Sequence, residues 1–120
     1  MRQGRIDYRM ARRALLRDVE VGLLSPREVC DAHPDLVRAG RHVGELTDDA
    51  CPICDGPGLR LVTYVFGKEV GGHSGKVVAR TSLGPLSQRY GDLNVYTVEV
   101  CTACCWHHLR ESFLLGREAG

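Results

Sequence analysis

Two pairs of cysteines have the spacing of metal ligands. Cys51 and Cys54 are separated by two residues in Cys-Pro-Ile-Cys-Asp-Gly, and Cys101 and Cys104 repeat that spacing in Cys-Thr-Ala-Cys. A Cys-x-x-Cys turn directs two thiolates toward one ion, and four thiolates make the closed tetrahedral shell of a structural zinc site. In the first turn we expect Gly56 to adopt the positive φ that the backbone requires. The sequence therefore predicts one structural Zn2+ bound by Cys51, Cys54, Cys101 and Cys104.

The second pair has neighbours that are also zinc ligands by type. Cys105, His107 and His108 follow Cys104 closely, and a thiolate or neutral imidazole from one of them can take its place in the shell. Because four thiolates leave no open coordination position, the predicted site favours a structural role over metal catalysis. A thiol enzyme built around Cys105 is a lesser alternative. Cys30 lies on an expected helix, and we expect it to pack in the core.

The composition favours a cytoplasmic location. Residues 1–20 lack the apolar segment of a signal peptide, and no apolar run approaches the about 18 residues that span a bilayer. In a reducing compartment paired cysteines stay thiols, which favours metal binding over disulfides. We therefore expect a cytoplasmic protein with no membrane partner. In a chain of only 120 residues, a structural metal would add materially to the stability of a small core.

The net charge of +1 conceals two basic segments. Residues 1–17 contain six arginines and one aspartate, net +5, and residues 60–90 contain five cationic residues and one glutamate, net +4. Such local fields attract phosphate groups or an acidic protein. Tyr64, Phe66 and Tyr90 can add base stacking if they are exposed. The predicted nucleic-acid or partner-binding residues are Arg9, Arg12, Arg13, Arg17, Lys68, Lys76 and Arg80.

Helical signals occupy the first third of the chain. Apolar residues at helical spacing predict an amphipathic helix over residues 7–22. Ser25-Pro26-Arg27-Glu28 forms a capping box with proline at the first helical position, so a short helix begins there. Pro34 ends that helix and introduces another over residues 35–43. These two helices also permit a helix-turn-helix interpretation, in which residues 35–43 enter the DNA major groove, but we favour a structural helical cap.

In the rest of the chain, side chains alternate with the period of two residues that is typical of β-strands. Three strands are predicted, over residues 59–66, 76–81 and 94–100. Glycine and proline predict that residues 67–75 and 82–92 are connecting loops. The apolar spacing of residues 107–115 predicts a short C-terminal helix.

The sequence between the cysteine pairs explains how they meet. The 46 residues between Cys54 and Cys101 exceed the about 15 to 20 of common four-cysteine motifs. A three-stranded antiparallel meander would carry the chain away from the first pair and return it to the metal. We expect an α+β fold in which short N-terminal helices pack with a three-stranded antiparallel zinc-ribbon-like sheet and a short C-terminal helix. Residues 1–46 would form the helical segment and residues 47–120 the zinc-ribbon-like domain.

The whole pattern resembles a small family of uncharacterised actinobacterial proteins with no assigned activity. The resemblance rests on the arginine-rich start, on Ser-Pro-Arg-Glu-Val-Cys-Asp at residues 25–31, and on Cys-Pro-Ile-Cys-Asp-Gly and Cys-Thr-Ala-Cys-Cys-Trp-His-His. It implies a bacterial cytosolic setting and no catalytic residues. More loosely, the cysteine turns resemble the zinc ribbons of transcription and translation proteins. The acidic pair of transcript-cleavage ribbons is missing from the predicted tip at residues 67–75, so that activity is not expected.

These observations predict a small, non-catalytic zinc protein. We expect it to bind nucleic acid or a nucleoprotein machine such as RNA polymerase or the ribosome, because two basic segments accompany the predicted ribbon. The alternative is a protein-protein adaptor, including one for an acidic protein partner. In that case an apolar exposed surface would mark the binding face.

Overall fold

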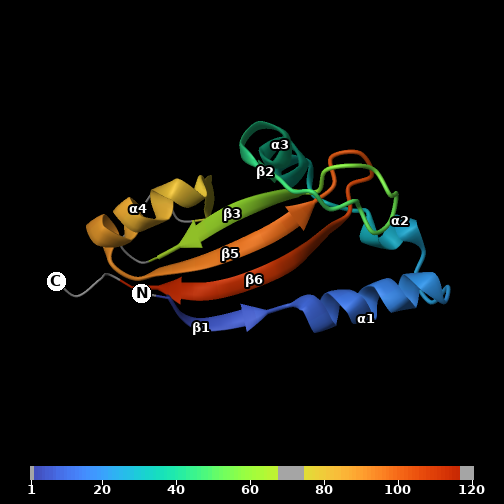
Figure 1. Cartoon of the computed structure of the whole chain (residues 1–120), viewed down its shortest axis with the longest axis horizontal. Helices are drawn as coiled ribbons and strands as arrows, with labels where there is room; N and C mark the ends of the chain where they lie inside the picture. The colour runs from blue at the N-terminus through green and yellow to red at the C-terminus, as the bar shows by residue number, and fades with distance from the viewer. Residues whose placement is uncertain (1, 68–74, 117–120) are drawn as a thin grey trace.

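The protein is built around one antiparallel sheet (Figure 1). The computed structural model describes residues 2–67 and 75–116. In that part of the chain the strand order is β1-β6-β5-β3-β2, and β4 pairs with the same edge of β3 as β2 does. The strands are β1 (Arg2–Asp7), β2 (Glu45–Leu46), β3 (Arg60–Phe66), β4 (Lys76–Val78), β5 (Leu93–Val100) and β6 (His107–Leu115). The α+β class is therefore confirmed, but the sheet has six strands where three were predicted.

The centre of the sheet is not the predicted meander. β3 pairs directly with β5 along its whole length, from Arg60 opposite Val100 to Phe66 opposite Asn94. β4 lies on the outer edge of β3 and does not separate β3 from β5. The chain can cross from β4 to β5 because residues 83–90 form a helix that passes over the sheet (Figure 1).

The prediction of a C-terminal helix is wrong. Residues 107–115 form β6, which lies between β1 and β5 in the sheet. The register with β5 shifts between Thr97 and Val98, so that Thr97 lies opposite Glu111 and Val98 opposite Leu109. One extra residue in β6 breaks the period-two alternation that would mark a strand. Both faces of β6 also carry apolar residues, and such a run cannot be distinguished from a helix by periodicity alone.

Strand β1 was also not predicted. It is an edge strand whose residues are nearly all exposed, so it lacks an apolar alternation. Its partner is β6, with Arg2 opposite Leu115 and Asp7 opposite Glu111. Gly4 has a φ of 58° at the irregularity in this pairing, a conformation that glycine adopts without steric cost. Residues from the two ends of the described chain therefore share one sheet.

The three N-terminal helices follow the local sequence signals. They are α1 (Arg9–Glu20), α2 (Pro26–Val29) and α3 (Pro34–Val43). The capping box of α2 is confirmed, because the Glu28 carboxylate accepts a hydrogen bond from the Ser25 N–H at 2.7 Å. His33 caps α3 by accepting from the Asp35 N–H at 3.0 Å.

A fourth helix replaces the predicted second loop. A short 3-10 turn, η2 (Arg80–Ser82), leads into α4 (Leu83–Tyr90). Pro85 lies in the first turn of α4, where backbone N–H groups have no helical partner and proline is tolerated. Gly84 and Pro85, which helped to predict a loop over residues 82–92, therefore belong to the start of a helix.

The sheet has apolar cores on both faces. Successive residues of β5 point to opposite faces. On one face Leu93 and Val95 pack with Phe113 beneath α4, and on the other Val62 and Val100 pack with Val37 of α3. We call these the α4 face and the α3 face. The two helices lie toward opposite ends of the sheet, so each face is only partly covered (Figure 1).

A third core lies at the end of the sheet where the two cysteine turns are. Trp106 is completely buried there, and it groups with Val29, Leu59, Cys51 and Cys101. Leu15, Leu16 and Val19 of α1 and Leu24 also pack against this group. The molecule is elongated, with extents of 51 × 27 × 24 Å. Among the described residues, no helix has both the length and the apolar character that crossing a membrane requires.

Candidate metal centre

The two cysteine turns have the same backbone geometry. In the first, the Cys51 N–H donates to the Gly56 carbonyl at 2.9 Å and the Cys51 carbonyl accepts from the Asp55 N–H at 2.9 Å. In the second, the corresponding bonds join Cys101 to Trp106 at 2.8 Å and Cys105 to Cys101 at 3.0 Å. Each turn therefore presents its two cysteines in the same way.

The positive φ falls one residue earlier than predicted. It occurs at Asp55, with a φ of 60°, and at the corresponding Cys105, with a φ of 71°, and not at Gly56. Gly56 meets a different requirement, because a Cβ there would lie 3.2 Å from the Cys54 Sγ. Aspartate tolerates left-handed backbone comparatively well, whereas a cysteine in that conformation is uncommon. The hydrogen bonds that close the second turn hold Cys105 in this state.

The four predicted ligands lie together at one end of the sheet. The Sγ atoms of Cys51, Cys54, Cys101 and Cys104 are all within 4.8 Å of one another. The Cys51 to Cys104 and Cys54 to Cys101 separations are 3.6 and 3.7 Å. With metal-sulfur bonds of about 2.3 Å, a tetrahedral site has sulfur-sulfur edges of about 3.8 Å. The four thiols can therefore hold a metal ion.

Burial and hydrogen bonds set how readily each thiol of the centre ionises. Burial raises the pKa of the Cys51 and Cys104 thiols above the ordinary value of 9.0. Burial also opposes ionisation of Cys101, but hydrogen bonds from the backbone N–H groups of Cys104 and Ala103 outweigh it and lower the pKa of Cys101. Similar N–H···S contacts join Ile53 to Cys51 and Gly56 to Cys54, both at 3.4 Å. N–H donors of this kind stabilise the thiolate that a metal requires.

The other candidate ligands have different roles. Cys105 lies outside the four-sulfur group and packs with the α3-face core. The Nε2 atom of His107 lies 2.9 Å from Asp31 Oδ1. His108 hydrogen-bonds the Leu109 carbonyl and stacks against Trp106 with ring centroids 5.9 Å apart. Cys104 thus occupies the fourth position in this arrangement.

Cys30 lies closer to the centre than expected. It packs with the core of Trp106, as predicted, but its Sγ is also 3.6 Å from the Cys104 Sγ. It does not belong to the group of four sulfurs that are mutually close. The chain between Cys30 and Cys104 is long, and no local spacing indicates that contact.

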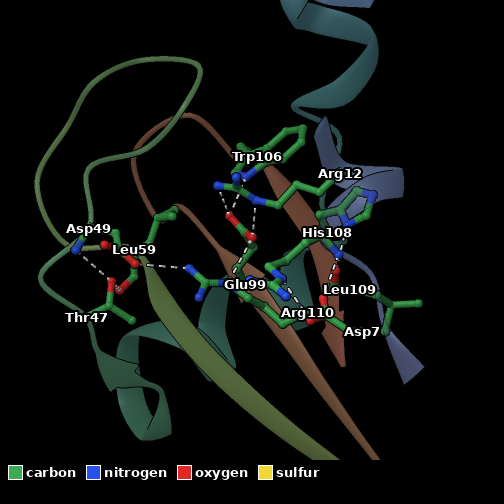
Figure 2. A network of polar contacts seen from close by, with 11 residues as sticks. Asp7, Arg12, Thr47, Asp49, Leu59, Glu99, Trp106, His108, Leu109 and Arg110 are labelled. Carbon is green, nitrogen blue, oxygen red and sulfur yellow. Dashed lines mark hydrogen bonds and ion pairs between the residues drawn. The ribbon is translucent and has the colours of Figure 1, made fainter. Parts of the chain in front are cut away.

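A buried carboxylate lies beside the cysteine centre, and sequence reasoning missed it. The side chain of Glu99 has no exposed surface, and it is surrounded by donors (Figure 2). Arg12 donates to its two oxygens at 2.5 and 3.0 Å, Arg110 donates at 3.1 Å, and the Trp106 indole N–H donates at 2.9 Å. Burial alone would raise the pKa of Glu99, but the hydrogen bonds from Arg12 and Trp106 and the charges of Arg12 and Arg110 lower it below 4.5. Glu99 is therefore held as a carboxylate.

This network connects segments that are distant in the sequence. Arg12 comes from α1 and Arg110 from β6, and Trp106 closes the second cysteine turn. Arg110 also reaches Asp49, two residues before Cys51, with 3.2 Å between Nη2 and Oδ2. The sequence did carry one signal, because Glu99 falls at an inward-facing position of β5, in step with Val95 and Thr97. The missing information was the identity of its partners.

The structure separates the predicted binding residues into two groups. The side chains of Arg9, Arg13, Arg17, Lys76 and Arg80 are exposed, whereas Arg12 is paired with Glu99. Lys68 lies outside the described residues. Among the aromatic candidates for stacking, Tyr64 and Phe66 lie with Tyr96 on the α3 face, and Tyr90 packs against the α4-face core.

Comparison with known proteins identifies the family of the chain, and that family has no known function. The model of DUF5318, a family of unknown function, matches residues 1–120. An uncharacterised protein of Mycobacterium bovis is 41% identical over 111 residues, which cover 92% of this chain and 81% of the relative. Uncharacterised proteins of two Mycobacterium tuberculosis strains match with the same identity and coverage. No solved structure matches the chain. The full-length match and the mycobacterial relatives agree with the actinobacterial resemblance in the sequence, and the chain belongs to the DUF5318 family.

Proposed function

We propose that the protein is a non-catalytic, zinc-stabilised cytoplasmic protein that binds nucleic acid or a nucleoprotein machine such as RNA polymerase or the ribosome. Four thiolates suit zinc, and they fill its usual coordination shell. The metal would then maintain the fold and would not activate a substrate. In this proposal the cysteine centre supports a binding surface located elsewhere on the molecule.

One observation carries the proposal for the ligand. Of the predicted cationic residues in the described part of the chain, Arg9, Arg13, Arg17, Lys76 and Arg80 have exposed side chains. Arg13 and Arg17 are one turn apart on α1, so their guanidinium groups can follow a line of phosphates. Exposed arginines of this kind contribute sequence-independent, salt-dependent affinity. Arg12 is left out of the proposed surface because it is paired with Glu99.

The test is a binding titration against single-stranded and double-stranded nucleic acids at several salt concentrations. We expect affinity to fall with salt, and Arg13→Gln with Arg17→Gln to weaken binding and flatten that dependence. Arg27→Gln with Arg41→Gln removes the same charge from exposed positions outside the predicted surface and serves as the matched control. Binding that is insensitive to salt, or equally weakened by both pairs, would refute the proposal. Native mass spectrometry of the reduced protein tests the metal, and a mass other than that of one bound zinc would contradict its identity.

A protein-protein adaptor is the second candidate function, and an apolar groove favours it. Tyr64, Phe66, Tyr96 and Val98 line a cavity of about 410 Å3 on the α3 face. Phe66 is 42% exposed and makes an edge-to-face contact with Tyr96. Exposed apolar patches commonly mark protein interfaces. If this function is the correct one, Phe66→Ala would abolish capture of a protein that binds regardless of salt and nuclease, while the arginine variants would retain it.

A further inference from the structure

Four arginines from separate elements line one groove on the α4 face of the sheet. They are Arg5 of β1, Arg9 of α1, Arg80 of η2 and Arg110 of β6. The groove has a volume of about 370 Å3, in the range of about 300 to 1,000 Å3 found for small-molecule sites. The other described residues that line it are Asp7, Leu61, Thr97 and Glu111. Tertiary structure brings these side chains together, because Arg9 and Arg80 are far apart in the sequence.

The lining carries both cationic and acidic groups. Asp7 Oδ2 lies 2.8 Å from Arg9 Nε and 3.8 Å from Arg5 Nη1, and Glu111 Oε2 lies 2.7 Å from Arg5 Nε. Arg110 forms ion pairs with two other carboxylates, those of buried Glu99 and of Asp49. Within the described residues, the ion pair of Arg80 is a long contact of 3.6 Å with Glu45, which is outside the groove. Among the described residues, the groove is therefore lined by four guanidinium groups and two carboxylates.

These contacts leave binding capacity in the guanidinium groups. Each group has five N–H donors, and the contacts described use one or two of them. The Nε contacts hold Arg5 and Arg9 in place, so less conformational freedom is lost when an anion binds. Guanidinium groups bind phosphate through paired hydrogen bonds. The exposed sides of Arg9 and Arg80 make the groove accessible to a ligand from solvent.

The carboxylates narrow the class of ligand. Asp7 and Glu111 would repel a ligand that is anionic throughout, but they accept hydrogen bonds from hydroxyl groups. A carboxylate that binds ribose hydroxyls beside a phosphate site is the arrangement used for nucleotides in other folds. The volume exceeds what a phosphate group alone would fill. A molecule with one phosphate and several hydroxyl groups satisfies both kinds of side chain.

We propose that this groove binds a sugar phosphate, the phosphate lying among Arg5, Arg9, Arg80 and Arg110 and the sugar hydroxyls near Asp7 and Glu111. This inference goes beyond the proposed function, because the ligand is a small molecule and the site uses Arg5 and Arg110 in addition to Arg9 and Arg80. The binding energy comes from charge-assisted hydrogen bonds, so it should require the phosphate and the arginine side chains.

Calorimetric titration of the zinc-loaded, full-length protein at low salt tests the proposal. Ribose 5-phosphate is the probe, and ribose and inorganic phosphate are the comparison ligands. We expect saturable binding of ribose 5-phosphate, weaker binding of inorganic phosphate and none of ribose. Arg9→Gln with Arg80→Gln should weaken ribose 5-phosphate binding by about tenfold or more, because each change removes charge-assisted hydrogen bonds. No saturable binding of ribose 5-phosphate would overturn the proposal, and equal binding of inorganic phosphate would overturn the role of the sugar.

Arg13→Gln with Arg17→Gln is the matched control, since it removes the same charge from α1 outside the groove. This control should bind ribose 5-phosphate like the unmodified protein, and an equal loss in both pairs would overturn the site assignment. Arg80→Gln alone provides a variant with little structural cost, because its ion pair with Glu45 is long and exposed. The same proteins titrated with an oligonucleotide test the proposed function separately. Nucleic-acid binding should depend on Arg13 and Arg17, whatever the result with ribose 5-phosphate.

Discussion

At the residue scale, the pairing of Arg12 with Glu99 should contribute strongly to the stability of the fold. A carboxylate without exposed surface is stable only when charged and polar partners replace its water. Arg12 supplies two of those hydrogen bonds. Of the arginines of α1, Arg12 therefore supports the fold, whereas Arg9, Arg13 and Arg17 face solvent.

Replacing Arg12 should accordingly be far more damaging than replacing its neighbour. We expect Arg12→Ala to lower the free energy of unfolding by about 3 to 5 kcal/mol, because it leaves a buried charge without its main partner. Arg13→Ala, at an exposed position, should change it by less than about 0.5 kcal/mol. Urea unfolding of the zinc-loaded proteins measures both values. Equal effects of the two substitutions would contradict the role assigned to Arg12.

The fifth sulfur near the metal centre provides a second test. Cys30 contacts Cys104 but is not among the four mutually close sulfurs, so we expect Cys30→Ser to retain one bound metal ion. Cys104→Ser removes a ligand and should lose or greatly weaken metal binding. Native mass spectrometry and cobalt substitution spectra, which report thiolate coordination, distinguish the two variants. Loss of metal from Cys30→Ser would mean that Cys30 is itself a ligand.

At the element scale, the close approach of α3 to the sheet is a tight packing constraint. Gly40 of α3 is buried, and a Cβ at this position would lie 2.7 Å from a methyl group of Val100. Val100 is itself fully buried and β-branched, so it cannot readily move away. This glycine allows α3 to cover the sheet next to the second cysteine turn.

A pair of glycine substitutions tests that constraint. Gly40→Ala should destabilise the protein by about 1 to 3 kcal/mol through overpacking, despite the better helix propensity of alanine. Gly84→Ala in α4 meets nothing within 4 Å and should leave stability unchanged or raise it by up to about 1 kcal/mol. Thermal unfolding of both variants gives the comparison. A stabilising effect of Gly40→Ala would contradict the close packing of α3 against β5.

At the scale of the whole molecule, the metal centre lies at one end of an elongated sheet. The core that contains Cys51, Cys101 and Trp106 is at that end, and the core beneath α4 contains no cysteine. Metal removal should therefore affect the two regions unequally.

Chelation of the metal should open the cysteine end first. We expect hydrogen exchange to accelerate in the two cysteine turns, α1 and α2, and less in the strands beneath α4, because the α4-side core has its own apolar contacts. Mass-spectrometric hydrogen exchange of the zinc-loaded and chelated proteins measures the difference. Uniform loss of protection would instead show that the metal stabilises the whole fold as one cooperative unit.

Sequence reasoning succeeded where the determining interactions are local. The spacing within each cysteine pair, the capping box at Ser25 and the starts of α2 and α3 depend on residues a few positions apart. Strands β3 and β5 alternate strongly enough to be recognised. By contrast, β1 and β6 were missed because an exposed edge strand and a bulged strand with two apolar faces lack a period-two pattern.

The sequence by itself determined that two cysteine turns of matching spacing flank a β-rich segment, because turn chemistry and alternation are properties of short stretches of chain. Tertiary structure decided that Cys104 and not Cys105 joins the sulfur group, that Glu99 is buried with Arg12, and that Arg9 and Arg80 line one groove. These outcomes depend on strand order and on contacts between residues far apart along the chain. Many pairings satisfy the same local patterns, and only packing of the complete sheet and its helices selects one of them.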